Sequence, residues 1–452
     1  MEQFFHLKEN RTTVRTEVIA GITTFMTMAY ILAVNPNLLG KTGMDGGSVF
    51  TATALASAIA SFAMALLANL PFALSAGMGL NAYFTYTVCM GMGYSWEVAL
   101  AAVCVEGLIF IVLSLTNVRE AIFNAIPGEL KLAVSVGIGL FITFIGLQNA
   151  HIVVDGATLV TLFSFKGSVT SGTFSSEGIT VLLALIGMLI TALLVIKNVK
   201  GNILLGILIT WGLGILCQLF GLYVPNPDAR FYSLIPSSLI AMPASVTPTL
   251  FKMDFSDLLS LNFVVVVFSF LFVDIFDTLG TLIGCASKAD MLDKDGKLPR
   301  IKGALLADAI GTTVGAVLGT STITTFVESS SGIAEGGRTG LTSIVVGFLF
   351  LLSLFFSPIF LAIPSFATAP ALIIVGFFMM QQVSKIDWSN MLTAIPSFIC
   401  IFAMPFAYSI SEGIAFGIIS YTVLHLAAGK GKNVTVLMYV LSFIFILKYI
   451  FL

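Results

Sequence analysis

Charged residues are scarce in this 452-residue chain, and none of them gather in a basic or acidic tail. Lysine, arginine, aspartate and glutamate together account for 10% of the residues, compared with about 25% in soluble globular proteins. The formal net charge is −2, and no basic patch stands out. This composition argues against a soluble protein and gives no reason to expect nucleic acid as a partner.

Residues that form metal centres and redox motifs are equally sparse. Five cysteines are scattered through mostly apolar stretches without a Cys-x-x-Cys pair, and three histidines lie far apart. We therefore expect neither a disulfide framework nor a structural zinc site. The glycine-rich stretches at 77–79 and 336–338 match neither a dinucleotide-binding nor a Walker pattern. No enzyme and no cofactor is expected, which leaves an ion gradient as the driving force.

Apolar residues, in contrast, make up 58% of the chain, and the mean hydropathy is +1.04. A helix that crosses a membrane needs about 20 apolar residues. We predict an all-α polytopic membrane protein with about fourteen spans, near residues 17–34, 50–70, 73–93, 97–116, 130–147, 178–196, 202–222, 261–284, 303–319, 321–337, 340–360, 363–381, 391–409 and 412–428. A further apolar stretch at 434–451 has three open interpretations, namely a span, an interfacial helix or a cap on the bundle.

The basic residues gather in the loops on one side of the predicted spans. They precede span one, as Lys8, Arg11 and Arg15, and they recur in the loops after the even-numbered spans from four to fourteen. Since short cytoplasmic loops are enriched in lysine and arginine, both ends of the fourteen-span unit are expected in the cytoplasm. The polar N-terminus lacks the features of a cleavable signal peptide. We expect a multi-pass protein of the plasma or inner membrane, surrounded by lipid, with its N-terminus in the cytoplasm.

Spans three and ten do not have the pattern of ordinary helices. Span three opens with a proline and two glycines in residues 71–81, and span ten opens with a run of threonine and isoleucine at 320–325. Proline and glycine weaken helices, and β-branched residues favour extended backbone. Extended backbone at membrane depth is tolerated only where it is buried in protein or lines a cavity. Each span is therefore predicted to be a half-strand followed by a half-helix.

Two pairs of segments indicate an internal repeat. Residues 55–59 (LASAI) resemble 306–310 (LADAI), an offset of 251 (306 − 55). Ile126-Pro127 with Gly139 and Phe141 resembles Ile363-Pro364 with Gly376 and Phe378, an offset of 237 (363 − 126). Two units of seven spans place the second unit upside down, and inverted repeats with broken helices are typical of secondary transporters. The predicted divisions are a cytoplasmic N-terminus at 1–15, a first repeat at 16–222, an external linker at 223–260, a second repeat at 261–428 and an apolar tail at 429–452.

Three carboxylates, Asp274, Asp277 and Glu328, lie inside apolar segments. A charge at bilayer depth costs about 3 kcal/mol or more, so such a residue is expected to face a polar cavity or a partner. These stretches are predicted to line a central site where a small polar molecule and a proton are handled together.

Four motifs carry a resemblance to a known family. Residues 20–30 with 34–36, residues 77–82, residues 272–278 and residues 326–330 resemble the corresponding spans of the AzgA-like adenine/guanine/hypoxanthine permeases, which are grouped with the nucleobase–ascorbate transporters. The resemblance implies a uracil-permease-like fold, with a core domain of spans 1–4 and 8–11 and a gate domain of spans 5–7 and 12–14. It also implies import of a purine nucleobase by proton symport, alternating access of the core against the gate, and usually a homodimer.

Carried over by motif, the resemblance implies that Glu328, Asp274 and Asn81 contact the substrate. An ionised carboxylate accepts hydrogen bonds only, so Glu328 suits two N–H groups on one edge of a purine, whereas Asn81 offers both donors and acceptors. Free backbone N–H groups are expected at Gly79 and Ser329, stacking on the base is expected of Phe326, and Thr278 is expected to bond the base or Asp274. Proton coupling is assigned to Asp274, Glu328 and Asp277.

The same residues also fit structural roles. Glu328 and Asn81 are also placed to cap half-helices, Phe326 to pack in the core, and the two aspartates to lock neighbouring helices together. Asp277 in particular suits a structural network between span eight and its repeat mate. At the level of function, the alternatives are sodium-coupled nucleobase uptake and an anion exchanger or channel of the same architecture.

Overall fold

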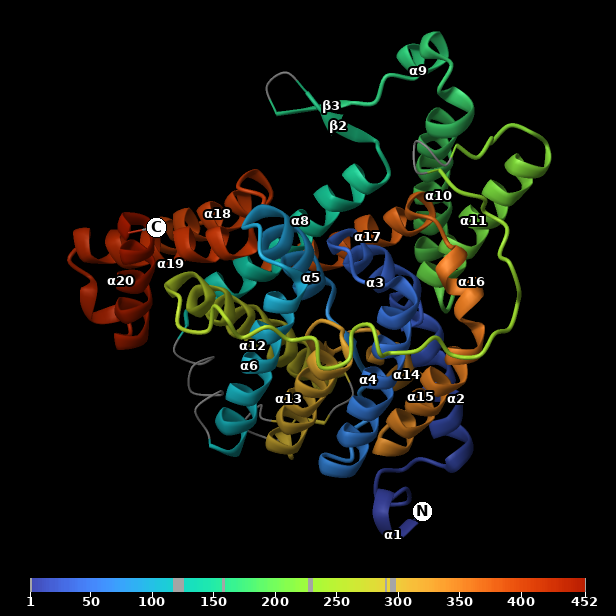
Figure 1. Cartoon of the computed structure of the whole chain (residues 1–452). Coiled ribbons are helices and arrows are strands. Elements are labelled where there is room, and N and C mark those ends of the chain that lie inside the picture. The colour runs from blue at the N-terminus through green and yellow to red at the C-terminus, as the bar shows by residue number, and fades with distance from the viewer. Residues whose placement is uncertain are drawn as a thin grey trace.

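The computed structural model describes residues 2–116, 126–156, 159–226, 231–288, 291–292 and 298–451. Within these residues, 11 helices are long and apolar enough to cross a membrane. The chain is therefore a multi-pass helical membrane protein, as predicted (Figure 1). The count of fourteen crossings stays a prediction, because several of the expected spans are broken or short.

The first half of the chain begins with a short helix and a long bent helix and ends at Leu219. Its elements are α1 (Glu2–Phe5), α2 (Val14–Met28), α3 (Ile31–Leu39), η1 (Gly40–Thr42), α4 (Gly46–Leu67), β1 (Leu74–Ala76), α5 (Met78–Ala82), the π-helical η2 (Tyr83–Gly91), α6 (Trp96–Leu115), α8 (Gly128–Asn149), β2 (Val153–Asp155), β3 (Val160–Leu162), α9 (Phe165–Ser171), η3 (Phe174–Gly178), α10 (Ile179–Ile196) and α11 (Asn202–Leu219).

The second half follows the same order of long helix, long helix, half-strand and half-helix. Its elements are α12 (Leu261–Lys288), α13 (Ile301–Leu318), β4 (Ile323–Thr325), α14 (Ser329–Ala334), α15 (Gly340–Ser353), η5 (Leu354–Phe356), α16 (Ser357–Ala362), α17 (Ser365–Met380), η6 (Gln381–Lys385), α18 (Met391–Phe406), α19 (Ile410–Ala427), η7 (Gly431–Asn433) and α20 (Val436–Phe451).

Both predicted half-strands are present, and they pair with each other. β1 and β4 run antiparallel, with Leu74 opposite Thr325 and Ala76 opposite Ile323. All six residues of the pair are buried, so their backbone groups lie away from lipid. Since each strand bonds the other, the two helix breaks lie at the same depth in the bundle.

The long helices form two packed groups. In one group α4 and α6 pack on α13, α2 and α4 pack on α15, and α12 packs on α6. In the other group α8 packs on α17 and α18, α18 packs on α19, and α10 and α11 pack together and on α17. Figure 1 shows the first group in the lower part of the view and the second group above it. This arrangement is the expected core and gate architecture, with the first group as the core and the second as the gate.

The second pair of repeat motifs meets in space. Helix α8 begins after Pro127 and α17 begins after Pro364, and a Cβ atom on Gly139 would lie 2.7 Å from the carbonyl oxygen of Gly376. The glycines that are related by the repeat therefore face each other where α8 crosses α17. Glycine at both positions lets the two backbones approach closely, as in other membrane helix pairs.

Two peripheral features complete the fold. The connection between α8 and α10 contains the hairpin β2–β3 and the short helix α9, which the apolar pattern did not predict. The stretch 434–451 forms α20, whose Phe445 ring lies 5.9 Å from that of Phe268 on α12. Because α20 also packs on α19, it covers one flank of the bundle, whatever its depth in the membrane.

Candidate functional site

The paired half-strands bring the starts of two half-helices together inside the helix bundle. β1 leads into α5 and β4 leads toward α14. The pairing continues past the strand ends, since the Gly77 N–H donates to the Thr322 carbonyl and the Phe326 N–H donates to the Ala73 carbonyl, both at 3.0 Å. The site is therefore built on backbone that is fixed from both sides.

Glu328 lies at the N-cap position of α14, but its carboxylate does not cap that helix. Its backbone is helical, with φ −60° and ψ −19°, whereas side-chain caps usually need an extended residue. The carboxylate instead accepts a hydrogen bond from the Tyr30 hydroxyl at 2.7 Å. The capping interpretation is therefore wrong, and the half-buried carboxylate faces the junction of α2 and α3.

Tyr30 is a site residue that the sequence interpretation missed. It is buried, and its ring centroid lies 6.5 Å from that of Phe326, which is itself buried. A signal was present, because Tyr30 closes the motif at 20–30 that carried the resemblance. Phe326 thus lies beside the Tyr30–Glu328 pair, and its proposed stacking on a base stays a prediction.

Ser329 does not offer the free backbone N–H that was expected. That N–H donates to the Phe326 carbonyl at 3.1 Å, and the Ser329 hydroxyl accepts from the Ala73 N–H at 3.0 Å. The expectation of a free N–H was wrong because the chain makes a tight turn before α14, which uses the first donors of the helix. Ser329 holds the beginning of β1 against the start of α14.

Asp274 and Thr278 lie in a buried group with a third residue, Asp308 of α13. The Thr278 hydroxyl lies 2.7 Å from an Asp274 carboxylate oxygen and 2.9 Å from one of Asp308. The expected contact between Thr278 and Asp274 is therefore present. Asp308 lies in the LADAI repeat motif at 306–310. The sequence indicated the repeat there but gave no sign that this residue belongs to the site.

Asp277, one turn away, lies between this buried group and Glu328. Its carboxylate accepts from the Thr324 hydroxyl at 3.3 Å, and it interacts electrostatically with both Asp308 and Glu328. Tyr30 is within the electrostatic reach of Asp277 as well. Within the described residues, neither Asp277 nor Glu328 has a lysine or arginine ion pair. Which of the two aspartates reaches a substrate stays a prediction.

Asn81 and Gly79 belong to the short helix α5. The fully buried Asn81 amide oxygen accepts from the Ser321 hydroxyl, and its nitrogen lies 3.5 Å from the Ala76 carbonyl. A Cβ atom on Gly79 would meet Ile138 of α8 at 2.9 Å, so Gly79 lies where the two helix groups touch. The structure thus places Asn81 at the strand crossing and Gly79 at the core–gate contact.

The remaining buried acid in this region, Glu106 of α6, accepts a hydrogen bond from the Thr322 hydroxyl at 2.7 Å. It therefore connects α6 to the segment before β4. In the part of the chain that the structure describes, no group of three or more His, Cys, Asp or Glu side chains is placed to hold a metal ion.

Comparisons with known proteins agree with this architecture. Residues 15–416 match the Permease family (Xan_ur_permease). The chain is 46% identical to the guanine/hypoxanthine permease PbuG of Bacillus subtilis, over all of both chains. It is 40% identical to the adenine permease AdeP of Escherichia coli, over all of this chain and 96% of that one.

A solved structure shares the fold at low sequence identity. The transmembrane domain of the cyanobacterial bicarbonate transporter BicA aligns with a TM-score of 0.60 and 15% identity, over 91% of this chain and 97% of that one. At this identity the likeness concerns the fold alone. Together with the motifs and the crossed half-strands, the family match means that this chain is a transporter of the permease family of nucleobase–ascorbate transporters and not an enzyme.

Proposed function

We propose that this permease imports purine nucleobases together with protons. The observation that carries the proposal is the Glu328 carboxylate, which is held by Tyr30 at the start of a half-helix and has no cationic partner in the described structure. Such a carboxylate accepts N–H groups, and every purine nucleobase presents N–H donors along its edge. The relatives PbuG and AdeP are named as purine permeases, which supports the same substrate class.

Proton coupling is proposed on the charge balance of the site. Asp277 interacts with both Asp308 and Glu328, and bringing several carboxylates together in a poorly solvated space disfavours full ionisation. A proton that binds to this group lowers the repulsion among the acids and prepares the site for a neutral base. Asp274 and Glu328 are the proposed carriers, and Asp277 shares their electrostatic field.

Alternating access is proposed to move the helix group of the paired half-strands against the group of α8, α17, α18 and α19. Gly79 supports this division, because it contacts Ile138 where the groups meet and carries no side chain to obstruct sliding. We also propose a homodimer in the plasma or inner membrane with a cytoplasmic N-terminus.

Anion exchange is the main alternative, because the fold is shared with a bicarbonate transporter. Glu328 opposes it, since a carboxylate at the helix start repels an anion that the half-helix would otherwise attract. Sodium coupling differs from proton coupling only in the ion. Uptake under a sodium gradient and under a proton gradient distinguishes the two.

The experiment is uptake of radiolabelled hypoxanthine, guanine and adenine into proteoliposomes under an inward proton gradient, a sodium gradient or no gradient. We expect proton-dependent uptake of at least one base, competed by another purine. Glu328→Gln should reduce that uptake at least about 10-fold, because the amide replaces one acceptor oxygen with a donor, a change worth about 1.4 kcal/mol or more.

The matched control is Glu335→Gln at the end of the same half-helix, where the carboxylate pairs with Lys200 instead of facing the site. This variant should transport like the wild type. Bicarbonate or sulfate uptake without purine uptake would instead support the anion alternative. Wild-type purine uptake in Glu328→Gln would show that the site is assigned to the wrong carboxylate.

A further inference from the structure

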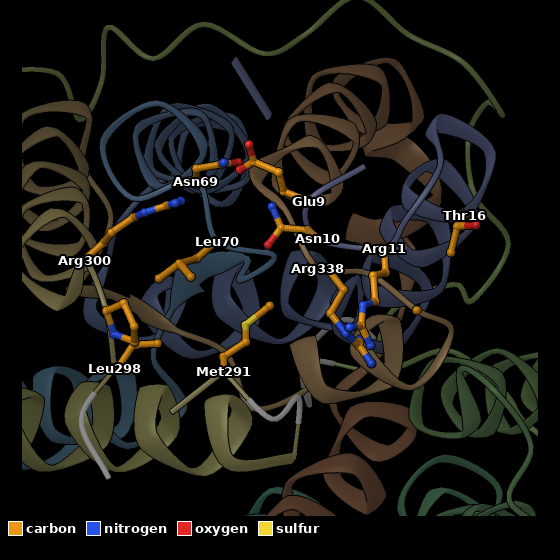
Figure 2. A pocket seen from close by; sticks show the side chains of 12 residues that line it. Glu9, Asn10, Arg11, Thr16, Asn69, Leu70, Met291, Leu298, Arg300 and Arg338 are labelled. Atoms are coloured by element: carbon orange, nitrogen blue, oxygen red, sulfur yellow. The ribbon is translucent and has the colours of Figure 1, made fainter. Parts of the chain in front are cut away.

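A polar cavity lies beside the N-terminal arm, away from the paired half-strands, and Figure 2 shows the side chains that line it. Its volume is about 590 Å³, within the range of about 300–1,000 Å³ that is typical of small-molecule sites. Four chain segments line it, namely the N-terminal arm with the start of α2, the α4–β1 connection, the residues before α13 and the α14–α15 connection.

Three arginines line this cavity. They are Arg11 of the N-terminal arm, Arg300 before α13, and Arg338 between α14 and α15. In Figure 2, Arg11 and Arg338 extend along one side of the cavity, and Arg300 lies on the opposite side. Among the described residues that line the cavity, Glu9 has the one carboxylate, so these residues carry three positive charges and one negative charge.

The described part of the chain provides no ion-pair partner for these positive charges. Across the described residues, none of the three arginines forms an ion pair with a carboxylate, and Glu9 instead lies 3.5 Å from His6. The Arg11 side chain has no hydrogen-bond partner in the described structure. The side chains of the other two bond carbonyl groups, Arg338 those of Ile333 and Gly337 and Arg300 that of Ala68. The backbone N–H of Arg338 donates to the Glu17 carboxylate.

We propose that this cavity binds a phosphate-bearing anion, either a lipid headgroup or a soluble phosphate ester. Guanidinium groups match the oxygen geometry of phosphate and bond it with two parallel N–H donors. An anion here would neutralise the excess charge of the three arginines. The side chains of Asn10 and Asn69 also line the cavity, but both bond the protein backbone, so the arginines are the groups that would hold the anion.

The site has a mechanical consequence because of the segments it joins. Asn69 and Leu70 lie just before β1, and Gly336 and Arg338 lie just after α14. A bound anion would therefore connect the N-terminal arm to the segment before β1 and to the segment after α14. We infer that occupancy stiffens the helix group that carries the transport site.

The arginines could instead serve only to stabilise the fold. A substitution of Arg11 distinguishes this structural role from anion binding. Arg300 and Arg338 bond carbonyl groups at the ends of α4 and α14, so their loss weakens the fold whether or not an anion binds. Arg11 is exposed and makes no such bond, so Arg11→Gln removes a positive charge from the cavity while leaving the helices intact. Arg15→Gln is the matched control, because Arg15 is also exposed in the N-terminal region but does not line the cavity.

The test is the thermal unfolding temperature of the purified, delipidated full-length protein at constant ionic strength. One arm compares inorganic phosphate and guanosine monophosphate with chloride, and the other compares phosphatidylglycerol with phosphatidylcholine in the same micelles. We expect a rise of about 2 °C or more in at least one arm, as expected for a ligand well above its dissociation constant. The rise should fall to less than half in Arg11→Gln and stay unchanged in Arg15→Gln.

A rise in the lipid arm alone assigns the site to a headgroup, and a rise in the soluble arm alone assigns it to a phosphate ester. No rise over the chloride and phosphatidylcholine controls would overturn the proposal, as would a full rise in Arg11→Gln. Should Arg11→Gln be recovered unfolded, Arg11→Lys provides the comparison, because it keeps the positive charge but loses the two parallel N–H donors and should reduce the rise. None of these readouts depends on transport, so failure here leaves the proposed purine uptake untouched.

Discussion

Asp274 and Asp308, on the neighbouring helices α12 and α13, lie on either side of a single threonine hydroxyl. The Thr278 oxygen is 2.7 Å from one carboxylate and 2.9 Å from the other. A hydroxyl carries one proton, so Thr278 either shares it between the two carboxylates or donates it to one of them. The Thr278 hydroxyl therefore connects the two acids across α12 and α13.

Thr278→Val tests whether this hydroxyl links the two helices. We expect a loss of about 1–3 kcal/mol in the free energy of unfolding, because two buried carboxyl groups lose a shared partner. The measurement is thermal or denaturant unfolding of the purified protein. Thr313→Val is the control, since the Thr313 hydroxyl bonds only the Ala309 carbonyl of its own helix. Equal losses in the two variants would contradict a linking role.

Tyr30→Phe tests the orientation of Glu328. The ring and its contact with Phe326 remain, and only the hydrogen bond to the carboxylate is lost. Since a hydrogen bond to a charged group contributes about 1.5–3 kcal/mol, we expect KM for the transported base to rise at least about 10-fold.

Tyr232→Phe, at an exposed position, should leave KM for the base unchanged. A lower KM in Tyr30→Phe would mean that the tyrosine competes with the base for the carboxylate instead of positioning it.

Gly376→Ala tests the crossing of α8 and α17. An added Cβ would overlap the Gly139 carbonyl and the Thr143 hydroxyl, and the first of these is a backbone atom rather than the end of a flexible side chain. We expect a destabilisation of about 1–3 kcal/mol, seen as a lower unfolding temperature.

Gly212→Ala, in the middle of α11, has no heavy atom within 4 Å of the new Cβ and should be neutral or slightly stabilising. A neutral Gly376→Ala would indicate that the two repeats are less tightly packed than the structure indicates.

Asp45 provides a pH-dependent test outside the membrane spans. It caps α4, and hydrogen bonds from the side chain and backbone of Ser48 hold its pKa below the usual 3.8. A lowered folded-state pKa stabilises the protein at neutral pH, and that contribution is lost as the pH falls through the lowered value.

Asp45→Ala should therefore cost about 1 kcal/mol at pH 7, with the difference from wild type shrinking below about pH 4. Asp45→Asn, which keeps the cap without the charge, should show little loss at pH 7. A cost in Asp45→Ala that is the same at pH 3 and pH 7 would contradict the assignment.

Much of the fold was predictable because its signals are local. The thirteen residues from Gly319 to Ser331 contain no long apolar run, and their threonines favour an extended backbone that only a buried position tolerates. The repeat also left a readable trace in Gly139 and Gly376, because a close crossing of two helices requires glycine whatever the rest of the sequence does. The hairpin β2–β3 was missed, because its short strands carry no distinct alternation.

The sequence by itself determined that the chain crosses the membrane many times, where two spans break, and which acids are too costly to face lipid. These follow from the transfer of each residue out of water and from backbone preference, which act on a few neighbouring residues at a time. Only the tertiary structure decided the partners of those acids. Tyr30 meets Glu328 across 298 positions, and Asp308 rather than another acid shares Thr278 with Asp274. Such partners depend on how each helix is rotated in the bundle, and that rotation is set by packing among residues that are far apart in the chain.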